Sequence, residues 1–285
     1  MSGSLFSFAE ALRTLLASGS AEGLEARWQD LNLENVGWRA LAGARRREVP
    51  AWECALREVD GLLLRLLGRV SQLPGSSERA NVRLRTFRLP ALERLQHATA
   101  ACLAGQRFGL AGLHTVSEDR SAPIARRYFA FLALAERHPL GDWPVFAQYL
   151  TPGAHHAFLG TAAEAARFYP EYGTVRALLK LFRQIQWDRH LRAFLSPRIL
   201  QSLHFIVDAS TLPFLRELLV VGYTSKNLEH CEVMRALVMV RRLTGSVESN
   251  AKFGDDELDS VAPLLDTAER VFDKSRDVLQ AVSVI

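Results

Sequence analysis

Apolar residues recur along almost the whole chain at the spacing of an α-helix. Near the N-terminus one helical face collects Leu5, Phe8, Leu12 and Leu15. A longer stripe of the same kind begins after Pro50, and further stripes follow at short intervals to the end of the chain. The breaks between them contain Pro, Gly or Ser, which commonly end helices and form turns. The pattern therefore predicts an all-α protein whose sequential helices pack as antiparallel neighbours.

Residues 82–89 are the exception, because apolar and basic residues alternate there as they do in a strand. A single strand has no partner for its backbone, so we predict an extended connector, with a local hairpin edge as the alternative. Pro90 is expected to open the next helix, because the first turn of a helix tolerates proline.

The second half of the chain shows a spacing that repeats. A shift of 31 residues carries Arg127 onto Phe158, Pro139 onto Pro170, Phe146 onto Ala177 and Leu150 onto Leu181. The shift is constant through a helix, a break with proline and the next helix. Later segments at 174–185, 196–210 and 225–245 have the same character, which gives about four helix pairs between residues 105 and 245. Spacings of this size are typical of helical-pair solenoids, where each pair buries its apolar face against its neighbours.

The segment SEDRSAPIARRYFAFLALAE (117–136) has acidic residues in a turn and arginines near the start of the following helix. It resembles a HEAT-like repeat, and VRALLKLF (175–182) and LPFLRELL (212–219) look like first helices of the same family. The resemblance covers roughly residues 105–245. One pair departs from it, since PGAHHAFLGTAAEA (152–165) has histidines in place of the arginine.

The resemblance implies an α-solenoid of antiparallel helix pairs that acts as a non-catalytic scaffold. In this family the second helices line a concave face that holds a partner. On this chain the resemblance therefore points to a partner-binding set of Arg126, Arg127, His155, His156, Arg198 and Arg235. Their positive character implies a protein partner with an acidic surface. An irregular helical bundle with chance similarity between its helices is the alternative architecture.

Three parts are expected along the chain. Residues 1–104 form an N-terminal helical region, 105–245 the HEAT-like repeats and 246–285 a C-terminal capping helix. The apolar seam of that last helix is expected to close the end of the stack, with docking on another chain as the alternative.

Composition and charge add little to this picture. The chain has 285 residues, of which 48% are hydrophobic and 23% charged, as in a soluble globular protein. A net charge of +4 permits nucleic-acid binding without favouring it, because dedicated binders concentrate their basic residues on one face. Trp187 and Asp188 are loosely similar to the aromatic and acidic residues of HEAT-like alkylpurine DNA glycosylases. A nucleic-acid-binding or DNA base-excision protein is therefore the alternative function.

No sequence motif of an enzyme or of a metal site occurs in the chain. It lacks G-x-S-x-G, the P-loop, the dinucleotide fingerprint, H-E-x-x-H and any C-x-x-C pair. His155 and His156 are adjacent, so on a helix they point ~100° apart and do not converge on one metal. We expect no catalytic residue, no metal and no cofactor. The cluster GARRR (43–47) is predicted to be a solvated helix end, with an acidic partner or a phosphate as the alternative.

The cysteines and the N-terminus favour a cytoplasmic protein. Cys54, Cys102 and Cys231 each lie among apolar neighbours, where a free cysteine behaves as a small hydrophobic residue in a reducing compartment. The N-terminus lacks the basic region of a signal peptide. No stretch approaches the roughly 18 uncharged apolar residues of a membrane span, so no membrane partner is expected.

Overall fold

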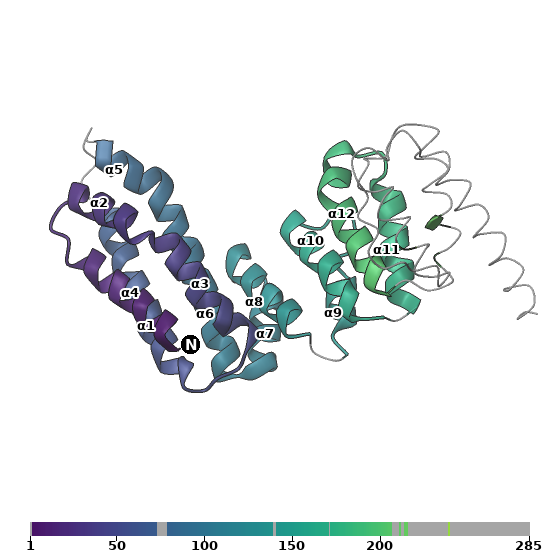
Figure 1. Ribbon diagram of the computed structural model, residues 1–285, viewed down its shortest axis with the longest axis horizontal. Coiled ribbons are helices and arrows are strands. Elements are labelled where there is room, and N and C mark those ends of the chain that lie inside the picture. The colour runs from purple at the N-terminus through teal and green to yellow at the C-terminus, as the bar shows by residue number, and fades with distance from the viewer. Residues whose placement is uncertain are drawn as a thin grey trace, which may run out of the picture. The chain divides into compact units, whose positions relative to one another are not determined.

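The computed structural model describes residues 2–72, 79–138, 141–170 and 172–206, together with positions 211, 214, 215 and 239. Across this part of the chain the secondary structure is helical and no strand occurs, which confirms the all-α prediction. The chain divides into two compact units, Met1–Pro139 and Leu140–Ile285, and each is considered by itself (Figure 1). The predicted capping helix at 246–285 lies outside the described residues.

Unit 1 is organised around one central helix. Its elements are α1 (Ser2–Leu16), α2 (Ala21–Leu31), α3 (Leu33–Arg46), α4 (Trp52–Gln72), α5 (Arg79–Arg83), the π-helical turn η1 (Leu84–Arg88), α6 (Leu89–Arg107), α7 (Gly109–Glu118) and α8 (Ile124–Arg137). Helix α6 contacts α3, α4, α7 and α8. Its buried residues occur round the helix rather than along one stripe, as expected for a helix that others enclose. The hydrophobic core of unit 1 therefore surrounds α6.

Helices α3, α6 and α8 run in the same direction. Between α3 and α6 the contacts advance along both helices, from Gly37 against Leu95 to Ala44 against Gln106. The contacts between α3 and α8 advance in the same way. The carboxyl-terminal ends of the three helices consequently meet at one end of unit 1, where their last carbonyl groups need hydrogen-bond donors.

Residues 82–89 are helical, so the prediction of an extended connector is wrong. The N–H of Leu89 donates to the carbonyl of Leu84 across the π-helical turn η1, and α6 follows directly. This wide turn lies just before Pro90, whose ring would clash with the carbonyl four residues earlier in a regular α-helix. Leu84 is buried while Arg83 and Arg85 are exposed, so the alternation reflects a one-sided helix. Pro90 stands in the first turn of α6, as predicted.

The helices expected to form the first repeat, α7 and α8, belong to unit 1. They contact each other, and both contact α6. The predicted boundary after residue 104 lies inside α6, whereas the division into compact units falls after Pro139. The apolar face of α8 is buried and packs against α6. The repeat-like spacing that begins near residue 105 gives no sign of this contact.

Unit 2 contains, within its described part, α9 (Trp143–Ala147), α10 (His156–Ala165), the 3-10 turn η2 (Ala166–Phe168), α11 (Tyr172–Ile185) and α12 (Arg189–Ile206). The 31-residue shift of the sequence also holds for the helices. Shifted by 31 residues, α8 covers 155–168, nearly the range of α10 and η2, and α9 falls inside α11.

Helix α12 begins earlier than the sequence pattern predicts. The pattern placed a break before Pro197 and a helix from residue 196, but α12 starts at Arg189 and continues through the proline. Asp188 caps the first turn, because its carboxylate accepts hydrogen bonds from two backbone N–H groups at 3.0 Å. Leu195 and Ile199 are both buried, so packing holds the helix on either side of the position where the proline removes a hydrogen bond.

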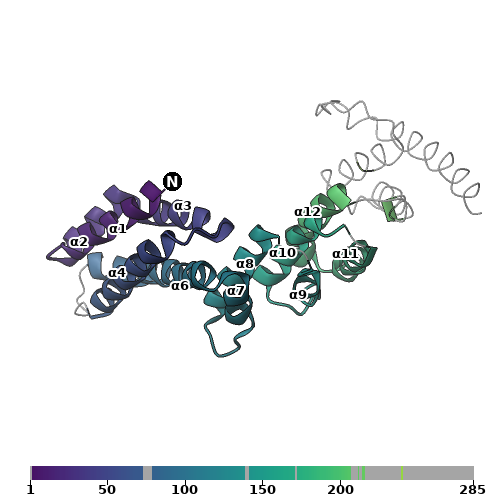
Figure 2. The same ribbon diagram turned by 90° about the horizontal axis from the view of Figure 1, so that it is seen from below.

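Helices α10 and α12 lie side by side and run parallel. Helix α12 packs on α10, α11 and η2, and α9 contacts α10 and α11 (Figure 2). The contacts between α10 and α12 advance in one direction, from His156–Phe194 through Glu164–Arg198 to Arg167–Phe205 next to α10.

Candidate interaction surface

The predicted partner-binding residues are divided between the two units. Arg126 and Arg127 lie on α8 of unit 1, and His155, His156 and Arg198 lie in unit 2. Arg235 is outside the described residues. The structure brings His156 and Arg198 to one surface, because both lie beside Phe194.

Arg127 makes contacts inside unit 1. Its Nε donates to the carbonyl of Ser117 at 3.1 Å, at the end of α7. Hydrogen bonds from Ser121, and after them the charge of Arg127, lower the pKa of Asp119 in the turn. Arg127 and Asp119, which suggested a repeat in the sequence, thus interact within the helix pair α7–α8.

Arg126 is half-buried and lies near titratable groups of α4 and α6. Burial raises the pKa of Asp60 despite a hydrogen bond from Gln96 and the charge of Arg126. Burial and the same arginine lower the pKa of His97. Nε of Arg126 and Nδ1 of His97 are buried without a hydrogen-bond partner. The charge of Arg126 is therefore felt by side chains of α4 and α6 within unit 1.

The adjacent histidines of α10 have different surroundings. His155 is the N-cap of α10, and its Nδ1 accepts a hydrogen bond from the N–H of Ala157 at 3.3 Å. The ring of His156 lies 6.1 Å from the ring of Phe194 on α12. Both histidines are exposed.

Arg198 is held in place by three groups around it. Its Nε lies 2.8 Å from the Glu164 carboxylate, and Nη1 donates to the carbonyl of Phe194. The guanidinium carbon stands 4.1 Å from the centre of the Phe194 ring, a cation–π contact. Gly160 makes room for that ring, because a Cβ at position 160 would lie 2.9 Å from it. The arginine remains 34% exposed.

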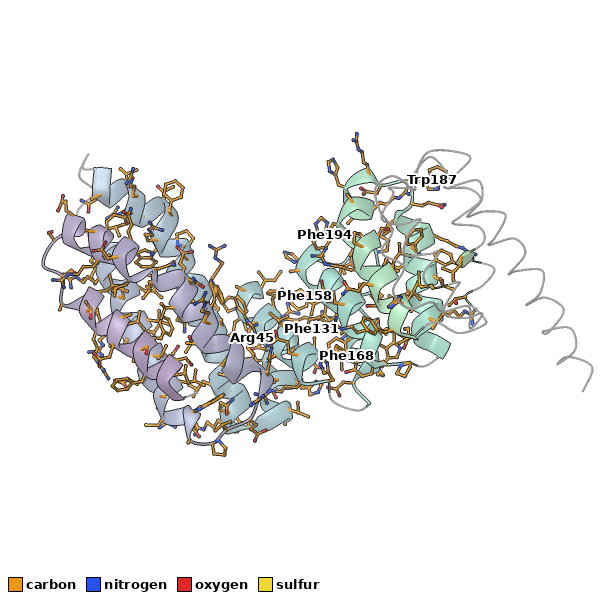
Figure 3. The ribbon with its side chains drawn as sticks, viewed as in Figure 1. Arg45, Phe131, Phe158, Phe168, Trp187 and Phe194 are labelled. Atoms are coloured by element: carbon orange, nitrogen blue, oxygen red, sulfur yellow. The ribbon has the colours of Figure 1, made fainter. Side chains whose placement is uncertain are left out.

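A second arginine–aromatic group lies further along the same two helices. Arg167 stands over Phe168 at 4.6 Å and over Phe205 at 6.0 Å. Both phenylalanines are exposed, Phe205 to 53%. We call the two groups together the α10–α12 surface, which consists of His156, Glu164, Arg167, Phe168, Phe194, Arg198 and Phe205. Figure 3 labels Phe168 and Phe194.

Sequence reasoning selected His156 and Arg198 of this surface and missed Arg167 and the aromatic residues. A signal was present, because His190, Phe194 and Arg198 are spaced at four-residue intervals on one face of α12. It could not be used while a break was predicted before Pro197, since Phe194 then fell outside the helix.

Trp187 and Asp188, the basis of the base-excision alternative, lie at the turn between α11 and α12 (Figure 3). The carboxylate of Asp188 is engaged as the cap of α12. Trp187 is 85% exposed, the largest exposed fraction among the large hydrophobic side chains of the described chain.

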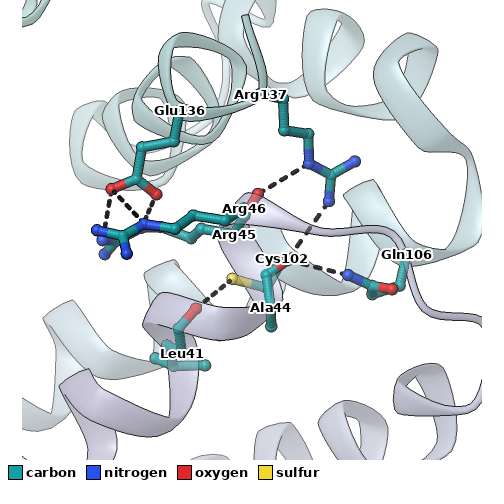
Figure 4. Close-up of polar contacts among 8 residues, drawn as sticks. All are labelled: Leu41, Ala44, Arg45, Arg46, Cys102, Gln106, Glu136 and Arg137. Carbon is teal, nitrogen blue, oxygen red and sulfur yellow. Dashed lines mark hydrogen bonds and ion pairs between the residues drawn. The ribbon is translucent and has the colours of Figure 1, made fainter.

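The GARRR cluster is a solvated helix end only in part, because Arg46 and Arg47 are exposed at the end of α3 whereas Arg45 is not. Arg45 is 13% exposed and forms a two-pronged pair with Glu136, both distances being 2.9 Å (Figure 4). Burial alone would lower the pKa of Arg45, but the pairing with Glu136 outweighs it and raises that pKa. Arg46 lies 3.8 Å from the same carboxylate. The acidic partner of Arg45 and Arg46 is therefore Glu136 of α8, in the same unit.

The end of α3 is closed by side chains from α6 and α8. Arg137 donates to the carbonyls of Arg45 at 2.8 Å and Ala44 at 3.4 Å (Figure 4). It also donates to the carbonyl of Gly105 at 3.3 Å. Gln106 donates to the Ala44 carbonyl at 2.9 Å. Burial lowers the pKa of Arg137, and Glu48 offsets this only in part. This network supplies the donors that the meeting helix ends require.

The two described cysteines differ. Cys102 is buried against the Leu41 carbonyl, and burial raises the pKa of its thiol to about 12. Cys54 is exposed and is not among the buried residues of α4. Cys231 lies outside the described residues.

In the described part of the chain no three His, Cys, Asp or Glu side chains are grouped so as to hold a metal ion. Of the helices that the structure describes, none combines the length and the apolar character needed to cross a membrane. Comparison of the chain with family models, with curated proteins and with solved structures gives no match.

Proposed function

We propose that the protein is a non-catalytic helical-repeat scaffold that binds an acidic surface of another protein through the α10–α12 surface. The observation that carries the proposal is the arrangement of Arg198, which is ordered over Phe194 and still a third exposed. An arginine ordered in advance loses little conformational entropy when it binds a carboxylate. Arginine and aromatic residues are also the side chains that most often dominate protein interfaces.

The contacts of unit 2 support a stack of helix pairs as the architecture. Helices α9 and α10 are in contact, as are α11 and α12, and these would be two successive pairs. The first helices α9 and α11 also touch, and so do the second helices α10 and α12. Such a two-layer order, with second helices running parallel, is the arrangement of a solenoid of the HEAT-like kind. The α10–α12 surface would then lie on the layer of second helices.

Glu164 does not prevent Arg198 from binding an acidic partner. Its side chain is 52% exposed, and exposed ion pairs contribute little to stability, typically about 0–1 kcal/mol. A partner carboxylate can replace Glu164 or share the guanidinium with it at low cost. Arg126 and Arg127 are left out of the proposed surface, because their contacts are inside unit 1.

The base-excision alternative loses its proposed acid. The position of Asp188 is accounted for by the two backbone N–H groups that it caps. We therefore do not assign a catalytic role to this residue.

A peptide library displayed on phage and selected on the immobilised full chain tests the proposed function. We expect the wild-type chain to select peptides in which Asp or Glu residues lie near an aromatic residue. Arg198→Glu should weaken binding of the selected peptides by roughly tenfold or more, because it reverses the charge at the centre of the surface. Arg39→Glu, at an exposed position of unit 1, is the matched control and should leave binding unchanged. Selection without acidic peptides, or full binding by Arg198→Glu, would refute the proposal.

A further inference from the structure

The outer face of α11 carries a row of basic residues that ends in an exposed tryptophan. Arg176, Lys180 and Arg183 follow one another at helical spacing, Trp187 follows in the turn after the end of α11, and all four are exposed. The opposite face is buried and consists of Val175, Leu178, Leu181, Phe182 and Ile185. The row is therefore fixed in direction by the packing of the helix that bears it.

Positive charge is concentrated in the segment of the sequence that contains α11 and the start of α12. Residues 172–192 contain five basic residues and one acidic residue, an excess equal to the net charge of +4 of the whole chain. The one acidic residue, Asp188, is engaged with backbone N–H groups of α12. Arg189 adds a further exposed cation directly after it. The rest of the chain is balanced in charge, so this segment accounts for the whole net positive charge.

Trp187 is the exposed member of a set of five tryptophans. Trp28, Trp52 and Trp143 are buried, and Trp38 is half-buried. Leaving an indole ring in water forgoes the hydrophobic stabilisation that burial of such a large side chain provides. Between residues 173 and 192 it is also the single large hydrophobic side chain that the structure shows exposed.

We propose that this edge, defined by Arg176, Lys180, Arg183, Trp187 and Arg189, binds single-stranded nucleic acid. Cations on successive turns of a helix lie about 5–6 Å apart, a spacing suited to contacts with neighbouring phosphates. The flat ring of Trp187 at the end of the row offers a surface on which an unpaired base stacks. A basic track with an aromatic platform is the general means of binding single strands without sequence preference.

The observations favour a single strand over other polyanions. In a duplex the faces of the bases are covered by their neighbours, so an exposed indole gains little from it. A membrane surface would call for several exposed apolar residues among the cations, and this edge shows one. An acidic polypeptide would satisfy the cations but offers the indole no regular array of flat faces.

The proposal goes beyond the proposed function and concerns a different set of residues. The α10–α12 surface depends on Arg198 and Phe194, which are not part of the α11 edge. Failure of either proposal therefore leaves the other standing, provided that variants of both surfaces are measured with both ligands.

Fluorescence anisotropy of a labelled oligothymidylate of about twelve nucleotides, titrated with the full chain at low salt, tests the α11 edge. We expect binding whose affinity falls with salt, with a log–log slope of roughly −2 to −3 for three or four phosphate contacts. Trp187→Ala should weaken binding by roughly tenfold and Trp187→Phe, which keeps an aromatic ring, by less. Lys180→Ala should make the slope shallower by about 0.7.

The controls separate this reading from general attraction of polyanions. Arg198→Glu should bind the oligonucleotide nearly as the wild type does, and Phe87→Ala, at an exposed aromatic position of unit 1, should be silent. The proposal is overturned if no binding occurs at low salt, or if Trp187→Ala binds as tightly as the wild type. Equal binding of a duplex of the same length, or equal competition by polyglutamate, would overturn it as well.

Discussion

At the scale of single residues, several arginines of unit 1 serve the ends of neighbouring helices. Arg137 reaches the last carbonyls of α3, Arg69 those at the end of α1, and Arg127 the end of α7. The last four carbonyls of a helix have no partner within the helix, and a guanidinium offers five N–H donors. Arginines such as Arg127, which the sequence alone assigned to a partner, therefore form hydrogen bonds to helix ends inside the unit.

Arg137→Met should lower the free energy of unfolding by about 3 kcal/mol, because it leaves buried carbonyls without donors. The side chain is 7% exposed and donates to carbonyls on both α3 and α6. Urea unfolding followed by circular dichroism measures the change. Arg46→Met is the control, since that side chain is 64% exposed and exposed ion pairs contribute typically about 0–1 kcal/mol. Equal effects of the two substitutions would contradict this account of the network.

His97 should make the stability of the protein depend on pH. Burial, and then the charge of Arg126, hold its pKa below the ordinary value of 6.5. Below that pH the unfolded chain binds a proton that the folded protein binds less readily, so stability present above pH 6.5 is lost as the pH falls. His97→Gln should reduce the loss of unfolding free energy between about pH 7 and about pH 5. Identical pH profiles of variant and wild type would show that the histidine plays no such part.

At the scale of helices, the sequence predicted the secondary-structure class and most helix positions, and it failed where tertiary packing decides. Segment 82–89 alternates like a strand, yet Leu84 packs inward from a helical turn that accommodates Pro90. Pro197 stands inside α12 because packing on either side of it holds the helix. The local sequence pattern does not contain information about those contacts, because they are made with other helices.

The candidate surface was predictable only in part, for a similar reason. Helical spacing identifies Arg198 as lying on an outer face of its helix, and this was found from the sequence. The spacing does not show that Phe194 packs on Gly160 and so brings α10 and α12 together. Nor does it show that Arg126 faces Asp60 and His97 of other helices rather than solvent.

The packing of α7 on α6 depends on the absence of a side chain at Gly112. A Cβ added there would lie 2.5 Å from the carbonyl oxygen of Ala104, so the two helices would have to move apart. Gly112→Ala should therefore lower the free energy of unfolding by about 2 kcal/mol or more, measured in urea. Gly61→Ala in α4, where nothing lies within 4 Å, should raise it by about 0.5–1 kcal/mol. A stabilising effect of both substitutions would mean that α7 does not approach α6 so closely.

At the scale of the whole molecule, the boundary between the units does not follow the boundary between apparently repeated and non-repeated sequence. The pair α7–α8 has the repeat-like sequence pattern, but its apolar residues complete the core around α6. Glu136 and Arg137 at the end of α8 also complete the network at the end of α3. A unit that ended at residue 104 would lose both, which is why the division falls after Pro139.

Residues 1–139 should consequently fold as an independent unit. The fragment contains the helices around α6 and every residue of the network at the end of α3. We expect a single cooperative urea transition for the fragment, and a loss on Arg137→Met that agrees with the loss in the full chain to within about 0.5 kcal/mol. The matched fragment 1–104 lacks α7 and α8, so it should show no cooperative transition. If 1–104 instead unfolds as cooperatively as 1–139, α8 is not part of the first core, and the sequence-based boundary would be the better one.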